Sequence, residues 1–96
     1  MSLYFVQHKH TAETCPAKDP VAGNMLLTHI NPLNARKFGV NILGDAVVDG
    51  QHTFVLIVDA ETQASVENFM GPFRQAGSVD ILPASSCEVV VERAGC

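Results

Sequence analysis

The chain has 96 residues, of which 47% are hydrophobic and 17% charged, and its formal net charge is -4. This length fits one domain over residues 1–96, because two hydrophobic cores would each be too small, and such a domain folds without disulfides or a structural metal. The 6 basic residues are not gathered on one stretch, which argues against the basic surface that binds nucleic acid.

The chain contains no apolar run near the roughly 18 to 20 residues that a membrane span requires. Its first residues also lack the basic and apolar blocks of a signal peptide. The odd number of cysteines, 3, argues against a disulfide framework and favours reduced thiols. We therefore expect a cytoplasmic protein without a membrane partner.

The first half of the chain predicts a strand followed by a helix. Residues 4–8 are aromatic and β-branched, as in a strand. Asp19 and the proline after it open an apolar-periodic segment, which predicts a helix over about 20–30. Asn31 is a suitable cap for a further short turn of helix, and Gly39 is placed to end that turn in the left-handed region.

Two more strands are expected at residues 40–48 and 53–58, joined by a tight turn. The dipeptide Asp49-Gly50 is typical of a two-residue hairpin loop. Asp45 lies within the first of these strands among apolar residues. Either it lines a cavity, or the strand is an edge strand and the carboxylate faces water, which is the more common arrangement.

A second helix is expected after Asp59, whose carboxylate can cap it. Its core-facing stripe follows the i, i+3, i+4, i+7 pattern and consists of Val66, Phe69, Met70 and Phe73. Pro72 removes one backbone donor, which predicts a kink or a displaced final turn, and Gly77 is expected to end the helix.

A fourth strand is predicted at residues 79–82, and Pro83 restricts it to an edge position or a bulge. Ser85 or Ser86 can cap whatever follows. The valine run at residues 89–91 fits a last short helix and an extended tail equally well.

The resulting order is strand, helix, strand, strand, helix, strand, which predicts an α+β, ferredoxin-like βαββαβ fold. In this fold a four-stranded antiparallel sheet carries two helices on one face, and the first and third strands lie at its centre. Both central strands are apolar on both faces. The face without helices therefore needs a cover, and we expect a homodimer formed through that face.

The element order, the doubly apolar central strands and the helix segment at residues 66–73 resemble the dimeric α+β barrel superfamily. This superfamily includes cofactor-free monooxygenases, muconolactone isomerases, stress-responsive barrels and small bacterial nickel-binding proteins. The resemblance implies a barrel-like dimer. Monooxygenase-like members commonly use a Trp or an Asn/His arrangement in the cavity, and this chain has no Trp. Metal-binding members place His residues on or just after the first strand, where His8 and His10 lie.

The candidate metal ligands begin with His8, His10 and Cys15. In an extended segment the first two share a face, so their imidazoles can hold one ion, and Cys15 would have to fold back from the loop. His29 and Cys87 are candidates to complete the shell. His29 also has a structural explanation at a helix C-terminus, and Cys87 one as a packing residue. His52 follows the Asp49-Gly50 turn and is expected to be exposed.

Three functions remain open from the sequence. The leading hypothesis is a metal-handling or metal-sensing protein, in which imidazole and thiolate ligands favour zinc, nickel or copper over calcium or magnesium. The second is a cofactor-independent small-molecule enzyme that uses a His as acid or base. The third is a non-catalytic dimeric interaction module. No phosphate-binding loop or nucleophile elbow is present, so no organic cofactor is expected.

Overall fold

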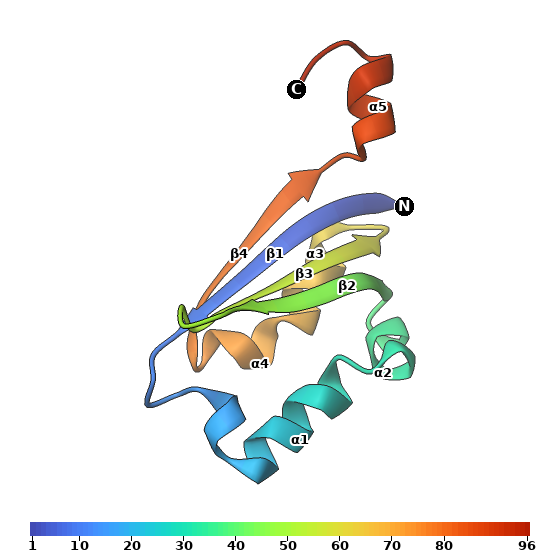
Figure 1. Cartoon of the computed structure of the whole chain (residues 1–96). Coiled ribbons are helices and arrows are strands. Elements are labelled where there is room, and N and C mark those ends of the chain that lie inside the picture. Colours follow the sequence, from blue (N-terminus) through green and yellow to red (C-terminus); the bar gives the residue numbers. More distant parts are fainter.

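The computed structural model describes residues 1–96 and has an α+β architecture built on one antiparallel sheet (Figure 1). The sheet has four strands in the order β2-β3-β1-β4. Their bounds are β1 Ser2–His10, β2 Val40–Val48, β3 Thr53–Ala60 and β4 Gly77–Ala84. The predicted four-stranded antiparallel sheet is confirmed, and its first and third strands occupy the two central positions as expected.

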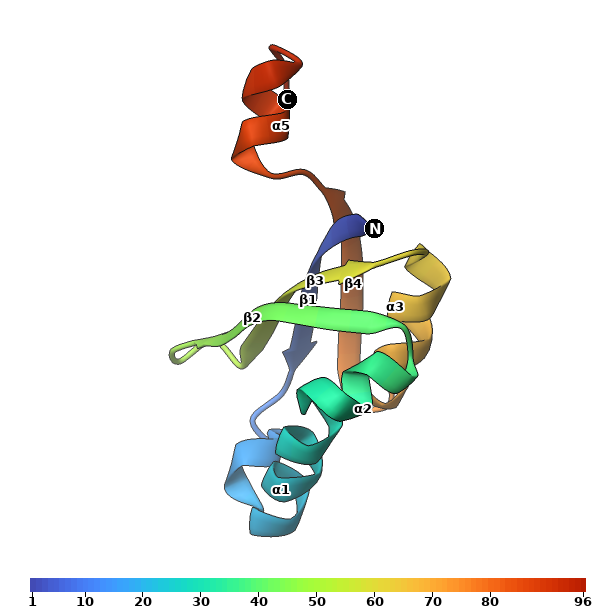
Figure 2. The same cartoon turned by 90° about the vertical axis from the view of Figure 1, so that its right-hand side faces the viewer.

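Helical segments fill both long connections and follow the last strand. Between β1 and β2 the chain forms a 3-10 turn, η1, and two helices, whereas two more helices link β3 to β4. Their bounds are η1 Pro16–Lys18, α1 Pro20–His29, α2 Pro32–Lys37, α3 Gln63–Phe69 and α4 Gly71–Arg74. The undecided last segment is a short helix, α5 Cys87–Glu92, which stands beyond the end of β4 (Figures 1 and 2). None of the helices has the length and apolar character needed to cross a membrane.

The hydrophobic core lies between one face of the sheet and the helices. Val6 of β1 is paired with Leu56 of β3, and both side chains are buried on this face. Val66 and Phe69 of α3 are fully buried against them, as the predicted helical stripe requires. Helices α1 and α2 contribute Leu26 and Ala35 to the same core, and the residues that follow these helices contribute Ile30 and Phe38.

Several helix boundaries follow the predicted capping chemistry. The side chains of Asp19 and Asn31 accept hydrogen bonds from the backbone of the first turns of α1 and α2. Pro72 displaces the final turn, since α3 ends at Phe69 and α4 begins at Gly71. The cap of α3 is Thr62, however, and the prediction of Asp59 was wrong, because β3 continues to Ala60 before the chain turns.

Two turn predictions are corrected by the strand register. Val48 pairs with Thr53, so the β2–β3 loop contains residues 49–52 and is longer than the expected two-residue turn. Gly77 does not end a helix but begins β4, where it pairs with His10. A Cβ atom at Gly77 would collide with the Lys9 carbonyl, so this position needs glycine for a close approach of the two strands.

The face of the sheet that carries no helices, called the open face below, presents an apolar row across three strands. Phe5 of β1 pairs with Ile57 of β3 on one side and with Leu82 of β4 on the other. Ile57 is 44% exposed and Leu82 is 50% exposed. At the two edges of the sheet, Asp45 of β2 is exposed to water and Pro83 lies in edge strand β4, as expected.

Candidate metal site

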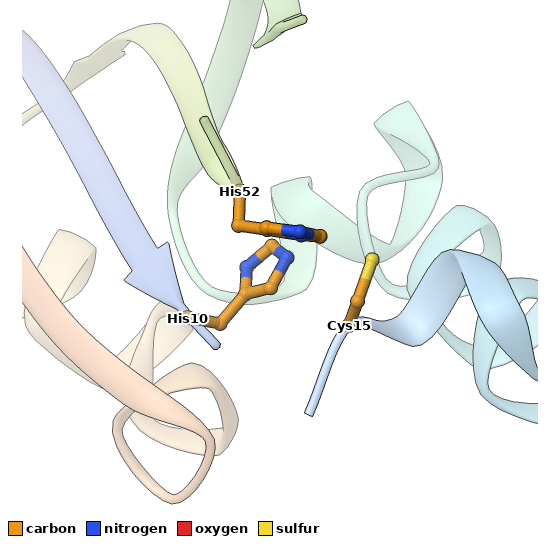
Figure 3. Close-up of side chains that lie close together, drawn as sticks. All are labelled: His10, Cys15 and His52. Atoms are coloured by element: carbon orange, nitrogen blue, oxygen red, sulfur yellow. The ribbon is translucent and has the colours of Figure 1, made fainter. Parts of the chain in front are cut away.

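Three potential metal ligands meet at one end of the sheet: His10, Cys15 and His52. One ligand atom of each lies within 4.8 Å of those of the other two. His10 is the last residue of β1, Cys15 precedes η1, and His52 ends the β2–β3 loop. Figure 3 shows the three side chains converging from these separate segments. All three residues are partly buried.

Backbone pairing places His10 beside the hairpin loop. The His10 N–H donates a hydrogen bond of 3.1 Å to the His52 carbonyl, which ties the end of β1 to the loop. On its other side His10 pairs with Gly77 of β4. His10 is therefore fixed between two neighbouring segments, and its ring lies 5.3 Å from the His52 ring, centroid to centroid.

His52 adopts a backbone conformation that is unfavourable for a residue with a Cβ atom. Its φ is +48°, in the left-handed region. Such a conformation costs about 1 to 2 kcal/mol for most residues other than Gly, although Asn, Asp and His adopt it more often than the rest. Backbone strain of this kind gathers at functional sites, where a particular side chain is needed. The conformation turns the His52 imidazole toward His10 and Cys15 (Figure 3).

Cys15 is held in place by the loop that precedes it. The Thr14 hydroxyl donates a hydrogen bond of 3.1 Å to the Ala76 carbonyl, immediately before β4. It also accepts a hydrogen bond of 3.1 Å from the Thr11 N–H. Pro16 then starts η1 and restricts the backbone after the cysteine. These contacts fold the loop back so that the thiol reaches the two imidazoles.

Burial lowers the pKa of two histidines here, His8 and His10, which favours their neutral form. Neither Nδ1 nor Nε2 of His10 has a hydrogen-bond partner, although both atoms are buried. Burial lowers the pKa of His10, and the nearby His52 lowers it further. The pKa of His8 is lowered mainly by burial, a hydrogen bond to Ser78 opposes this shift, and His10 adds a smaller decrease. Neutral imidazoles are the form that binds metal ions.

His8 lies next to the three-residue group but outside it. It shares a face of β1 with His10, as predicted, and the two rings stack with centroids 5.2 Å apart. His8 Nδ1 is 3.1 Å from the Ser78 carbonyl oxygen. Because a carbonyl only accepts, Nδ1 carries the proton, and His8 Nε2 is left as a hydrogen-bond acceptor.

The structure does not bring His29 or Cys87 to this group. His29 Nε2 donates a 2.7 Å hydrogen bond to the Phe69 carbonyl, and its ring stacks on Phe69 with centroids 4.5 Å apart. Its Nδ1 lies 3.5 Å from the Asn34 amide nitrogen. His29 therefore joins α1 to α3. Cys87 is exposed in α5, which follows the end of β4 opposite to the site (Figure 1).

The prediction that His52 is an exposed loop residue was wrong, and the sheet topology explains why. Lys9 pairs with Thr53, so the end of β1 lies beside the start of β3. The residue before Thr53 must then lie next to His10. The expected central position of β1 and β3 already indicated that these strands are neighbours. Their register, which places His52 beside His10, could not be read from the sequence.

A pocket of about 220 Å³ adjoins the three ligands. His10, Cys15 and His52 all line it, together with His8. Its apolar wall includes Leu26 of α1, Val47 of β2, Phe54 of β3 and Phe73 of α4. The site therefore combines a cluster of metal ligands with an apolar space large enough for a small molecule.

No protein-family model, no curated protein and no solved structure matches this chain. The resemblance to the dimeric α+β barrel superfamily therefore stays a prediction. Function has to be argued from the chemistry of the site.

Proposed function

We propose that this protein binds one transition-metal ion through His10, Cys15 and His52, and that it handles or senses that ion. The observation that carries the proposal is the state of the His10 ring, whose two nitrogens are buried without partners beside a thiol and a second imidazole. An unsatisfied buried polar group costs about 1 to 3 kcal/mol. A bound ion would offset that cost by accepting a lone pair from the ring.

The donor set favours zinc, nickel or copper. Imidazole is a ligand of intermediate softness and thiolate is a soft ligand, whereas calcium and magnesium require oxygen ligands. By bond lengths and tetrahedral angles, ligand atoms on one zinc ion lie about 3.3 to 3.8 Å apart. The three candidate ligand atoms lie within 4.8 Å of one another, so binding requires them to approach by up to about 1.5 Å.

The first experiment is a metal analysis of untagged protein purified under reducing conditions. We expect close to one equivalent of zinc, nickel or copper per chain, either as purified or after addition at micromolar concentration. The Cys15→Ser variant should lose most of this metal, because it removes the thiolate ligand. Cys87→Ser is the matched control, since it removes an exposed thiol far from the site and should retain the metal. Absence of binding in the parent, or equal binding in both variants, would refute the proposal.

We also propose that two copies associate through their open faces. The row formed by Phe5, Ile57 and Leu82 is apolar and has no cover within the chain. Helix α5 also supports association with a second copy. It has only six residues, and its Val91 side chain is 75% exposed. An isolated helix this short is marginal in water, and contacts with a second chain would stabilise it. A second copy has its own open face and its own α5. In a two-fold arrangement the two copies can cover both of these surfaces on each other.

A further inference from the structure

The three-residue group is one ligand short of a closed tetrahedral site. Structural zinc sites have four protein ligands, whereas sites with three keep a position for water or a substrate. The group within reach contains no fourth His, Cys, Asp or Glu. His8 lines the same pocket but does not belong to this group. The remaining coordination position is therefore left to an external ligand.

The pocket beside the ligands restricts what that external ligand can be. Its volume is about 220 Å³, which is the volume that about seven water molecules occupy in the liquid. Its lining includes no Lys or Arg, and its one carboxylate belongs to Asp49. A carboxylate or phosphate group would find no opposite charge there apart from the metal. A neutral donor with a small apolar body fits both the size and the charge of the pocket.

His8 adds a second point of recognition. It lines the same pocket, and its tautomer leaves Nε2 as an acceptor without a partner in the protein. A ligand that offers one lone pair to the metal and one N–H to His8 would satisfy both groups. Among small molecules, neutral imidazole-type heterocycles have this arrangement of donor and acceptor on one ring.

Resting on the proposed metal site, we infer that the bound ion keeps an open coordination position facing this pocket, and that the position takes a small, neutral, imidazole-type ligand. The pocket walls then select the ligand by size, and His8 orients it.

The test uses the full-length protein loaded with Co²⁺, whose absorption bands in the visible range respond to coordination. Added 4-methylimidazole should shift these bands and saturate at one equivalent per bound Co²⁺, whereas acetate at equal concentration should shift them much less. Val47→Phe enlarges a side chain that lines the pocket from the edge strand β2. It should lower the affinity for 4-methylimidazole about tenfold or more. Val21→Phe, at an exposed position outside this pocket, is the matched control and should leave that affinity unchanged.

The outcomes separate this inference from the metal proposal. If Co²⁺ binds but 4-methylimidazole leaves the spectrum unchanged at saturating concentration, the open position is refuted and the metal site stands. Equal binding by the parent and Val47→Phe would place the ligand outside the pocket, and an acetate shift as large as that of 4-methylimidazole would refute the neutral ligand class. If Co²⁺, zinc, nickel and copper all fail to bind, the metal proposal fails and this inference fails with it.

Discussion

At the scale of single residues, His52 shows most directly how the fold and the site make opposing demands. Its left-handed backbone would be less strained with Asn, which tolerates this region through local hydrogen bonding. The turn alone gives no reason for an imidazole at this position, whereas the proposed metal site does.

The variant His52→Asn separates these two demands. We expect the metal-free variant to be as stable as the parent or up to about 1 kcal/mol more stable, because the strain is relieved. Its metal affinity should fall about 100-fold or more, since even the loss of a group that only supports a ligand costs about 10- to 100-fold. Urea denaturation of the apo-protein and competition with a chromophoric chelator measure the two effects. An unchanged affinity would exclude His52 from the site.

The buried histidines predict an acid sensitivity of the metal-free protein. Burial lowers the pKa of both His8 and His10, so below the ordinary value of about 6.5 the unfolded chain binds more protons than the folded one. Stability should therefore be fully present above pH 6.5 and decline as the pH falls through the lowered pKa values. Denaturation in urea between pH 7.5 and 5 tests this. His10→Gln should have a shallower pH dependence than the parent, and identical slopes would contradict the assignment.

The ligands differ in how far the sequence could predict them. The position of His10 follows from strand alternation, whereas that of Cys15 also depends on the contact of Thr14 with the Ala76 carbonyl, far along the chain. His29 was ambiguous between ligand and structural residue, and only the tertiary contact with the Phe69 carbonyl decides for the latter. The placement of His52 depends on a pairing between β1 and β3, more than forty positions apart in the chain, which local patterns do not encode.

At the scale of elements, the close pairing of β1 and β4 positions the ligand-bearing end of β1. Gly77 lies opposite His10, and a Cβ atom there would meet the backbone of Lys9 and His10. Because the obstructing atoms are backbone, the strands would have to separate or shift. His10 would move with them.

Gly77→Ala should therefore lower both stability and metal affinity. We expect a loss of about 1 to 3 kcal/mol in the free energy of unfolding, as for other overpacked sites, together with weaker metal binding. Gly71→Ala is the control: it lies in α4, a Cβ atom there meets nothing within 4 Å, and it should be neutral or slightly stabilising. Chemical denaturation and metal titration of both variants provide the comparison, and equal behaviour would show that the β1–β4 approach is not required.

The elements themselves were predictable where local chemistry determines them. The side chains of Asp19 and Asn31 cap their helices, and Pro72 interrupts its helix, for reasons that lie within a few residues. The errors lie where tertiary pairing extends a strand. Asp59 continues β3 because Leu3 and Asn41 pair with it on either side, which delays the helix to Thr62.

At the scale of the whole molecule, the distribution of apolar surface leads to a prediction about assembly. One face of the sheet is covered by helices, and the open face is not. If the open faces meet, the parent should have twice the chain mass of 10.3 kDa in solution. Ile57→Asp places a charge on the apolar row, beside its central residue Phe5, and should produce monomers.

Size-exclusion chromatography with light scattering distinguishes these states. Val21→Asp is the matched control, because it introduces the same charge at an exposed position of α1, away from the open face, and should remain dimeric. A parent that stays monomeric over the full concentration range, or a control that dissociates like Ile57→Asp, would contradict the interface.

The origin of the three candidate ligands in separate segments would have a kinetic consequence. His10, Cys15 and His52 belong to a strand end, a loop and a hairpin, which meet at the site but are not continuous in the chain. If the proposed ion binds there, it can leave by breaking one bond at a time, while an incoming chelator occupies each vacated position. Exchange of the ion would then accelerate with the concentration of the acceptor, as the proposed handling of metal requires.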